Sequence, residues 1–139
     1  MQGARKSDAR ATDQRLQRCD PRRCRSRRER ALSYFRRAAA YLKQEDFDNA
    51  IHDFGEGLTL DPGNATALYG RGIAYEAKKD SDRAIQDYDA AIKLDPRHVK
   101  ALSNRVAIYA DRRAYERALE DNNRVVELEP KLRVMSRAA

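Results

Sequence analysis

The central part of the chain alternates between stretches in which apolar residues recur every three or four positions and short polar breaks. Spacing of this kind places the apolar residues on one face of a helix. The first two stretches carry it at Tyr34, Ala38, Tyr41 and Leu42 and then at Phe47, Ala50, Ile51, Phe54 and Leu58. Because polar residues 44–46 separate them, we expect two helices joined by a turn, with Asp46 as the N-cap of the second.

The same pattern returns with a fixed period. Pro62, Pro96 and Pro130 are evenly spaced, and each follows a leucine and an acidic residue. The polar breaks also recur, and Asp80 takes the N-cap position of Asp46. This predicts three units at 31–64, 65–98 and 99–131, and a short tail at 132–139. One unit cannot bury its apolar faces alone, so we expect the units to stack.

The pattern and its period resemble the tetratricopeptide repeat, a helix–turn–helix unit of about 34 residues. The first-helix signature is found as Tyr34-x2-Arg37-Ala38-x2-Tyr41, Leu68-x2-Arg71-Gly72-x2-Tyr75 and Leu102-x2-Arg105-Val106-x2-Tyr109. The second-helix signature is found as Ala50-x3-Phe54 and Ala84-x3-Tyr88, and it changes to Ala118-x3-Asn122. The resemblance implies an all-α solenoid of three hairpins that acts as a protein–protein interaction module, with no catalytic activity and no cofactor.

The resemblance also implies a binding site. In the family, the first helices line a concave groove that holds a segment of a partner protein. Carried over position by position, the groove consists of Leu32, Phe35, Ala39, Leu42, Lys43, Thr66, Tyr69, Gly70, Ile73, Glu76, Lys100, Ser103, Asn104, Ala107 and Asp111. Two alternatives remain open: these residues pack inside the array, or the N-terminus of the chain covers them.

One family subtype does not fit. Members that clamp the carboxylate terminus of a chaperone use Lys and Asn on successive first helices. Here the corresponding positions carry Phe35 and Ala39 in the first unit and Gly70 in the second, while Lys100 and Asn104 in the third are compatible. We therefore expect no carboxylate clamp.

The basic residues are concentrated at the N-terminus of the chain. The chain of 139 residues has a net charge of +7, and residues 1–30 alone contain eleven basic and four acidic residues. The rest is neutral, so the basic character belongs to an N-terminal tail. Residues 1–18 contain few large apolar residues and are predicted to be mobile, whereas a helix can extend back to about residue 22 behind Asp20 and Pro21. The alternative function is therefore an adaptor whose arginine-rich tail binds nucleic acid or an anionic surface.

Other chemistry finds little support in the sequence. No nucleotide-binding or nucleophile motif is present, and no metal is expected, because Cys19 and Cys24 lie far from His52 and His98. The acidic residues of the second helices, Asp53, Glu56, Asp87, Asp89, Glu120 and Asp121, are predicted to be solvated. No stretch is apolar enough to cross a membrane, and we expect a cytoplasmic protein.

The last unit suggests self-association. Val125, Val126 and Leu128 would normally be covered by a following helix. An open apolar end favours an end-to-end homodimer through the C-terminal repeat. In the competing arrangement, Leu132, Val134 and Met135 fold back as a partial cap and the chain is a monomer.

Overall fold

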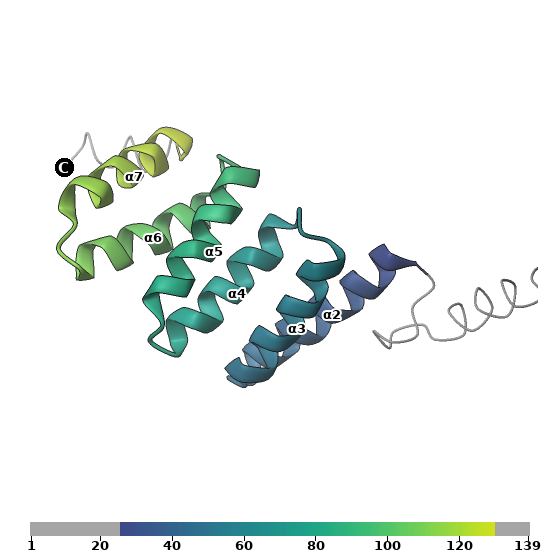
Figure 1. Cartoon of the computed structure of the whole chain (residues 1–139). Coiled ribbons are helices and arrows are strands. Elements are labelled where there is room, and N and C mark those ends of the chain that lie inside the picture. Colours follow the sequence, from purple (N-terminus) through teal and green to yellow (C-terminus); the bar gives the residue numbers. More distant parts are fainter. Residues whose placement is uncertain (1–25, 130–139) are drawn as a thin grey trace, which may run out of the picture.

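The computed structural model describes residues 26–129, which form six helices and no strand (Figure 1). The helices are α2 (Arg27–Lys43), α3 (Phe47–Leu60), α4 (Ala65–Ala77), α5 (Ser81–Leu94), α6 (Val99–Asp111) and α7 (Tyr115–Leu128). Figure 1 shows three hairpins, α2–α3, α4–α5 and α6–α7, stacked one beside the next. The predicted all-α solenoid is confirmed.

Side-chain caps explain where the second helices of the first two hairpins begin. The carboxylate of Asp46 accepts a hydrogen bond from the Asn49 N–H at 3.3 Å, and Asp80 accepts one from the Arg83 N–H at 3.2 Å. The third hairpin has Ala114 at this position and no side-chain cap. The backbone of Ala114 (φ −83°, ψ 62°) is nonetheless close to that of Asp80 (φ −94°, ψ 73°), so the local geometry already suits a capping residue.

We therefore expect Ala114→Asp to stabilise the protein. The new carboxylate can accept from a free N–H in the first turn of α7 and interact favourably with the helix dipole. The free energy of unfolding in urea should rise by about 1 kcal/mol. The reciprocal control, Asp80→Ala, should lower it by a similar amount. An unchanged unfolding midpoint for Ala114→Asp would show that the start of α7 is limited by something other than its cap.

The first helix begins inside the arginine-rich segment. Ser26 caps α2, accepting from the Glu29 N–H at 3.1 Å. The guanidinium of Arg27 donates to the carbonyl oxygens of Leu60 at 2.9 Å and Thr59 at 3.2 Å, which lack intrahelical partners at the end of α3. One tail arginine thus has a structural role. The helix begins at Arg27 and does not continue back to about residue 22 as predicted, because Ser26 has an extended backbone. The predictions for the mobile residues 1–18 and for tail binding to nucleic acid fall outside the described residues.

Three of the acidic residues are not solvated, which corrects the sequence interpretation. Asp53, Asp87 and Asp121 are 1%, 5% and 4% exposed. Each accepts two hydrogen bonds from the arginine 16 residues earlier, in the first helix of the same hairpin. The distances are 2.5 and 2.9 Å from Arg37, 2.8 and 2.8 Å from Arg71, and 2.6 and 2.6 Å from Arg105. Every hairpin is therefore closed by one bidentate ion pair.

The burial of these pairs has an electrostatic consequence. The hydrogen bonds that Arg37 and Arg71 donate to the facing carboxylates raise the pKa of both guanidinium groups above their usual value, against the opposing effect of burial. The guanidinium groups also lie over tyrosine rings, at 5.7 Å for Arg37 over Tyr34 and 6.0 Å for Arg71 over Tyr75. Each arginine stays charged and is held on two sides.

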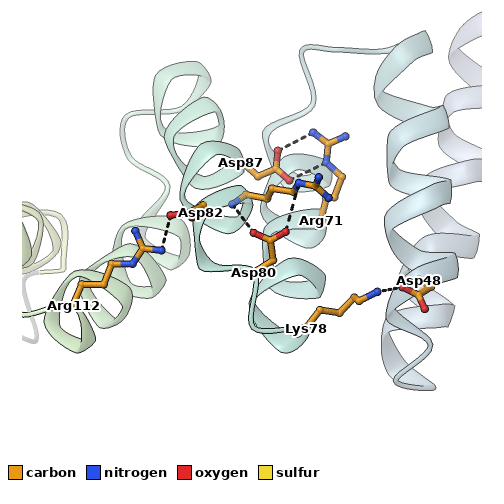
Figure 2. A network of polar contacts seen from close by, with 8 residues as sticks. Asp48, Arg71, Lys78, Asp80, Asp82, Asp87 and Arg112 are labelled. Carbon is orange, nitrogen blue, oxygen red and sulfur yellow. Dashed lines mark hydrogen bonds and ion pairs between the residues drawn. The ribbon is translucent and has the colours of Figure 1, made fainter.

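A second series of ion pairs joins successive hairpins. Lys78, the C-cap of α4, pairs with Asp48 of α3, and Arg112, the C-cap of α6, pairs with Asp82 of α5 at 2.7 Å (Figure 2). The two pairs are equivalent, since both partners are shifted by one repeat. All four side chains are at least 43% exposed, so each pair adds little to stability. The same contact is thus found at both junctions between successive hairpins.

Helix α7 exposes other apolar residues than the sequence predicts. Val125 is only 6% exposed and belongs to the hydrophobic core, and Val126 and Leu128 are partly buried. The open apolar residues of α7 are instead Tyr115 (64% exposed) and Leu119 (60% exposed). The patch predicted for the homodimer is therefore wrong, because the second helix turns Val125 toward its own hairpin. Leu132, Val134 and Met135 lie outside the described residues.

Candidate functional site

An apolar pocket of about 380 Å³ lies between the first helices of the first two hairpins. Helices α2 and α4 contact each other directly there. Eight predicted groove residues line the pocket: Leu32, Phe35, Ala39, Leu42, Thr66, Tyr69, Gly70 and Ile73. The structure thus brings together most of the α2 and α4 residues that the family resemblance implies, and whether they bind a ligand stays a prediction.

The floor of this pocket is built from aromatic rings and a glycine. Phe35 and Phe54 lie with ring centroids 6.5 Å apart. A Cβ atom on Gly70 would lie 2.5 Å from the Phe54 ring, so only glycine lets α4 approach α3 this closely. Phe35 is 9% exposed and forms part of the floor, whereas Leu32 is 44% exposed and stands at the rim. The accessible apolar surface of the pocket therefore comes from Leu32 rather than from Phe35.

A more polar pocket of about 410 Å³ continues the groove between α4 and α6. It is lined by Ile73, Glu76, Ala77, Lys79 and Asn104. Ile73 belongs to both pockets, so the two are adjacent.

A hydrogen-bonded cluster forms the back of the polar pocket. The hydroxyl of Tyr88 donates to Glu76 Oε2 at 2.7 Å, and the Asn104 Nδ2 donates to the Tyr88 hydroxyl at 3.1 Å. Burial raises the pKa of Tyr88 well above its usual value; the hydrogen bond from Asn104 opposes this and the Glu76 carboxylate adds to it. Tyr88 therefore remains a hydroxyl donor, and Glu76 is its acceptor.

Five predicted groove residues lie away from these pockets. They are exposed and line neither of the two: Lys43, Lys100, Ser103, Ala107 and Asp111. Tyr69 lines the apolar pocket and also packs against two further rings, with its ring centroid 5.9 Å from that of Tyr88 and 5.1 Å from that of His98. Burial raises the pKa of Tyr69 as well, so its hydroxyl is available as a neutral hydrogen-bonding group.

Sequence reasoning missed the contribution of the second helices. Phe54 of α3 lines the apolar pocket, and the fully buried Tyr88 of α5 forms hydrogen bonds with Glu76 and Asn104 of the polar one, although the resemblance places only first-helix residues in the groove. Phe54 becomes Tyr88 one repeat later, as Leu42 becomes Glu76 and Gly70 becomes Asn104. Most other positions also differ between successive repeats, so the sequence alone gives no signal that these three meet.

Comparison with known families agrees with the geometry. The family model of the tetratricopeptide repeat matches residues 35–96 and 80–132. The chain belongs to the tetratricopeptide repeat family. Members of this family are generally non-catalytic, and this tetratricopeptide repeat protein is a module for protein interaction. Among curated proteins, none matches the sequence significantly.

Solved structures support the same assignment. The chain is 33% identical to the first TPR of Spaghetti (RPAP3) bound to the HSP90 peptide SRMEEVD, covering 78% of this chain and 91% of that one, with a TM-score of 0.69. The first TPR domain of human RPAP3 gives the same identity and coverage and a TM-score of 0.67. The Arabidopsis OM64 TPR domain, 24% identical over 76% of this chain and 88% of that one, shares the fold with a TM-score of 0.73.

Metal sites and membrane spans are two further features to consider in the described part of the chain. Within residues 26–129, no group of three or more His, Cys, Asp or Glu side chains is placed to hold a metal ion. None of the six helices described combines the length and apolarity that crossing a bilayer requires. Cys19 and Cys24 lie outside this region.

Proposed function

We propose that this protein binds a peptide segment of a partner protein in the groove formed by α2, α4 and α6. The observation that carries the proposal is the apolar pocket between α2 and α4, which leaves Leu32 accessible beside the half-buried Ile73 and Tyr69. Pockets that are mostly apolar with a few placed polar groups are the usual form of a ligand site. A large apolar side chain of the peptide would fill it.

The ligand differs in kind from a chaperone C-terminus. The first TPR of Spaghetti (RPAP3) has been solved with an HSP90 peptide. The family resemblance implies that members which clamp a chaperone terminus hold its carboxylate with Lys and Asn. In this chain the positions of the first two units hold Phe35, Ala39 and Gly70, which offer no cation and no side-chain donor to an anion, and only Lys100 and Asn104 of the third unit are compatible. We infer that the peptide is held by apolar contacts rather than by its carboxylate terminus.

The test uses two exposed leucines as a matched pair. Leu32 is 44% exposed at the rim of the apolar pocket, and Leu94 is 50% exposed at the end of α5, outside it. Leu32→Asp places a charge in the pocket and should weaken peptide binding at least tenfold, since desolvating an unpaired carboxylate is costly. Leu94→Asp should bind like the wild type. Fluorescence titration with peptides selected from a displayed library measures both.

The choice of Leu32 matters because aromatic groove residues also support the fold. Phe35 packs its ring against Gly57, where an added Cβ would lie 2.4 Å away, so truncating Phe35 would disturb the α2–α3 hairpin itself. The Leu32→Asp variant should keep the wild-type melting temperature. If Leu32→Asp binds the selected peptides as tightly as the wild type, the groove is not the binding surface.

A further inference from the structure

Two equivalent sets of three residues, one repeat apart, are found at the groove, and they differ in chemistry. The first copy consists of Leu42, Phe54 and Gly70, and the copy one repeat later consists of Glu76, Tyr88 and Asn104. The first copy lines the apolar pocket between α2 and α4. In the second, hydrogen bonds of 2.7 and 3.1 Å join the three side chains. Equivalent places in the groove are thus apolar at one hairpin junction and polar at the next.

Glu76 brings a negative charge into this second place. Within residues 26–129 it forms no ion pair, in contrast to the core carboxylates Asp53 and Asp87, which each face an arginine. Its hydrogen-bond partner is the neutral hydroxyl of Tyr88, which uses one acceptor site and leaves the carboxylate without a directly paired cation. Because Tyr88 is fully buried and is itself held by Asn104, the carboxylate is fixed in position before any ligand arrives.

We propose that the pocket beside Glu76 takes the Lys or Arg side chain of a peptide whose apolar side chain fills the pocket between α2 and α4. A preorganised, half-buried carboxylate without a cation is complementary to a basic side chain. Ile73 lines both pockets, so one short peptide spans them. The inference rests on the proposed function and specifies its ligand: a segment with adjacent apolar and basic residues.

Lys79 provides a control of opposite sign. It lines the same pocket, is exposed and forms no ion pair with Glu76. Its charge repels a basic ligand, so removing it should favour the proposed peptide. Glu76→Gln is the matching variant, because the amide oxygen of Gln still accepts from the Tyr88 hydroxyl and only the charge is lost.

The experiment pans a displayed library of random linear peptides on the wild type. Selected peptides should combine a large apolar residue with Lys or Arg. The tightest of them, made as a synthetic peptide, should bind Glu76→Gln about tenfold more weakly than the wild type, a difference typical of one charged hydrogen bond. Lys79→Ala should bind it as tightly or more tightly. Replacing the basic residue of the peptide with norleucine should cost affinity for the wild type and little for Glu76→Gln.

The outcomes separate the inference from the function on which it rests. Selected peptides that are apolar without a basic preference, that carry acidic residues, or that bind Glu76→Gln as well as the wild type overturn the basic subsite and leave the groove in place. Peptides that bind Leu32→Asp undiminished, or a library that yields no enrichment, overturn the groove itself. Melting curves of each variant verify that the fold is kept.

Discussion

Arg71→Ala should unfold the protein or bring it close to unfolding. Within residues 26–129, Arg71 is the only ion-pair partner of Asp87, and the Asp87 side chain is 7% exposed. Removing one member of a buried ion pair leaves an uncompensated charge and costs about 3–5 kcal/mol. Small domains have a total stability of about 5–15 kcal/mol, so this is a large share. Urea unfolding followed by circular dichroism at 222 nm measures the loss.

Two further variants identify the cause. Arg83→Ala removes an arginine that is 65% exposed and pairs with Asp80 at 3.5 Å, and its effect should stay within about 0.5 kcal/mol. The double variant Arg71→Met with Asp87→Leu removes both charges and should recover most of the loss, because apolar residues often replace a buried pair without penalty. If Arg71→Ala is as stable as Arg83→Ala, the pair is not important for stability.

Gly72→Leu should be comparably damaging, for a steric reason. A Cβ atom at position 72 would lie 2.5 Å from Cε1 of Tyr88. Tyr88 cannot move aside easily, because it is fully buried and its hydroxyl is tied to Glu76 and Asn104. Overpacking a core of this kind costs about 1–3 kcal/mol or more, and the bulk of leucine beyond its Cβ takes the expected loss to the upper end. Thermal unfolding measures it.

A graded series makes the steric cause visible. Gly72→Ala should destabilise less than Gly72→Leu but still measurably, since the alanine Cβ alone meets the Tyr88 ring. Gly63→Ala is the control: nothing lies within 4 Å of a Cβ there, and its backbone is not in the positive-φ region. Its melting temperature should match that of the wild type. Equal stability of Gly72→Leu and wild type would contradict the α4–α5 packing described above.

The arginine–aspartate pairs show how far a periodic sequence can be interpreted before packing is known. Arg37, Arg71 and Arg105 recur in register, and so do their partners on the second helices. The recurrence indicates a shared role, but the pattern of a single helix predicts that an acidic side chain faces solvent. Only the crossing of the two helices decides that each carboxylate faces inward and meets a guanidinium.

In the groove, too, some features follow from the sequence and others only from the structure. Position-by-position comparison with the family placed Phe35, Tyr69, Ile73, Glu76 and Asn104 on first helices, and the structure puts these residues along two adjacent pockets. The comparison with the family could not show that Phe35 is mainly a packing residue, because that role depends on its contact with Gly57 of another helix. Nor could it show the hydrogen bonds that gather Glu76 and Asn104 around Tyr88, since these three come from three helices.

The sequence by itself determined the helices, their order and their stacking. These follow from local signals, namely apolar spacing, aspartate caps and evenly spaced prolines, which act within a few residues along the chain. The tertiary structure alone decided which polar groups are buried, which apolar residues of α7 stay open, and which side chains meet in the groove. Those properties depend on contacts between side chains far apart along the chain, such as Tyr88 with Glu76 and Arg112 with Asp82, and the distance and angle between helices set them.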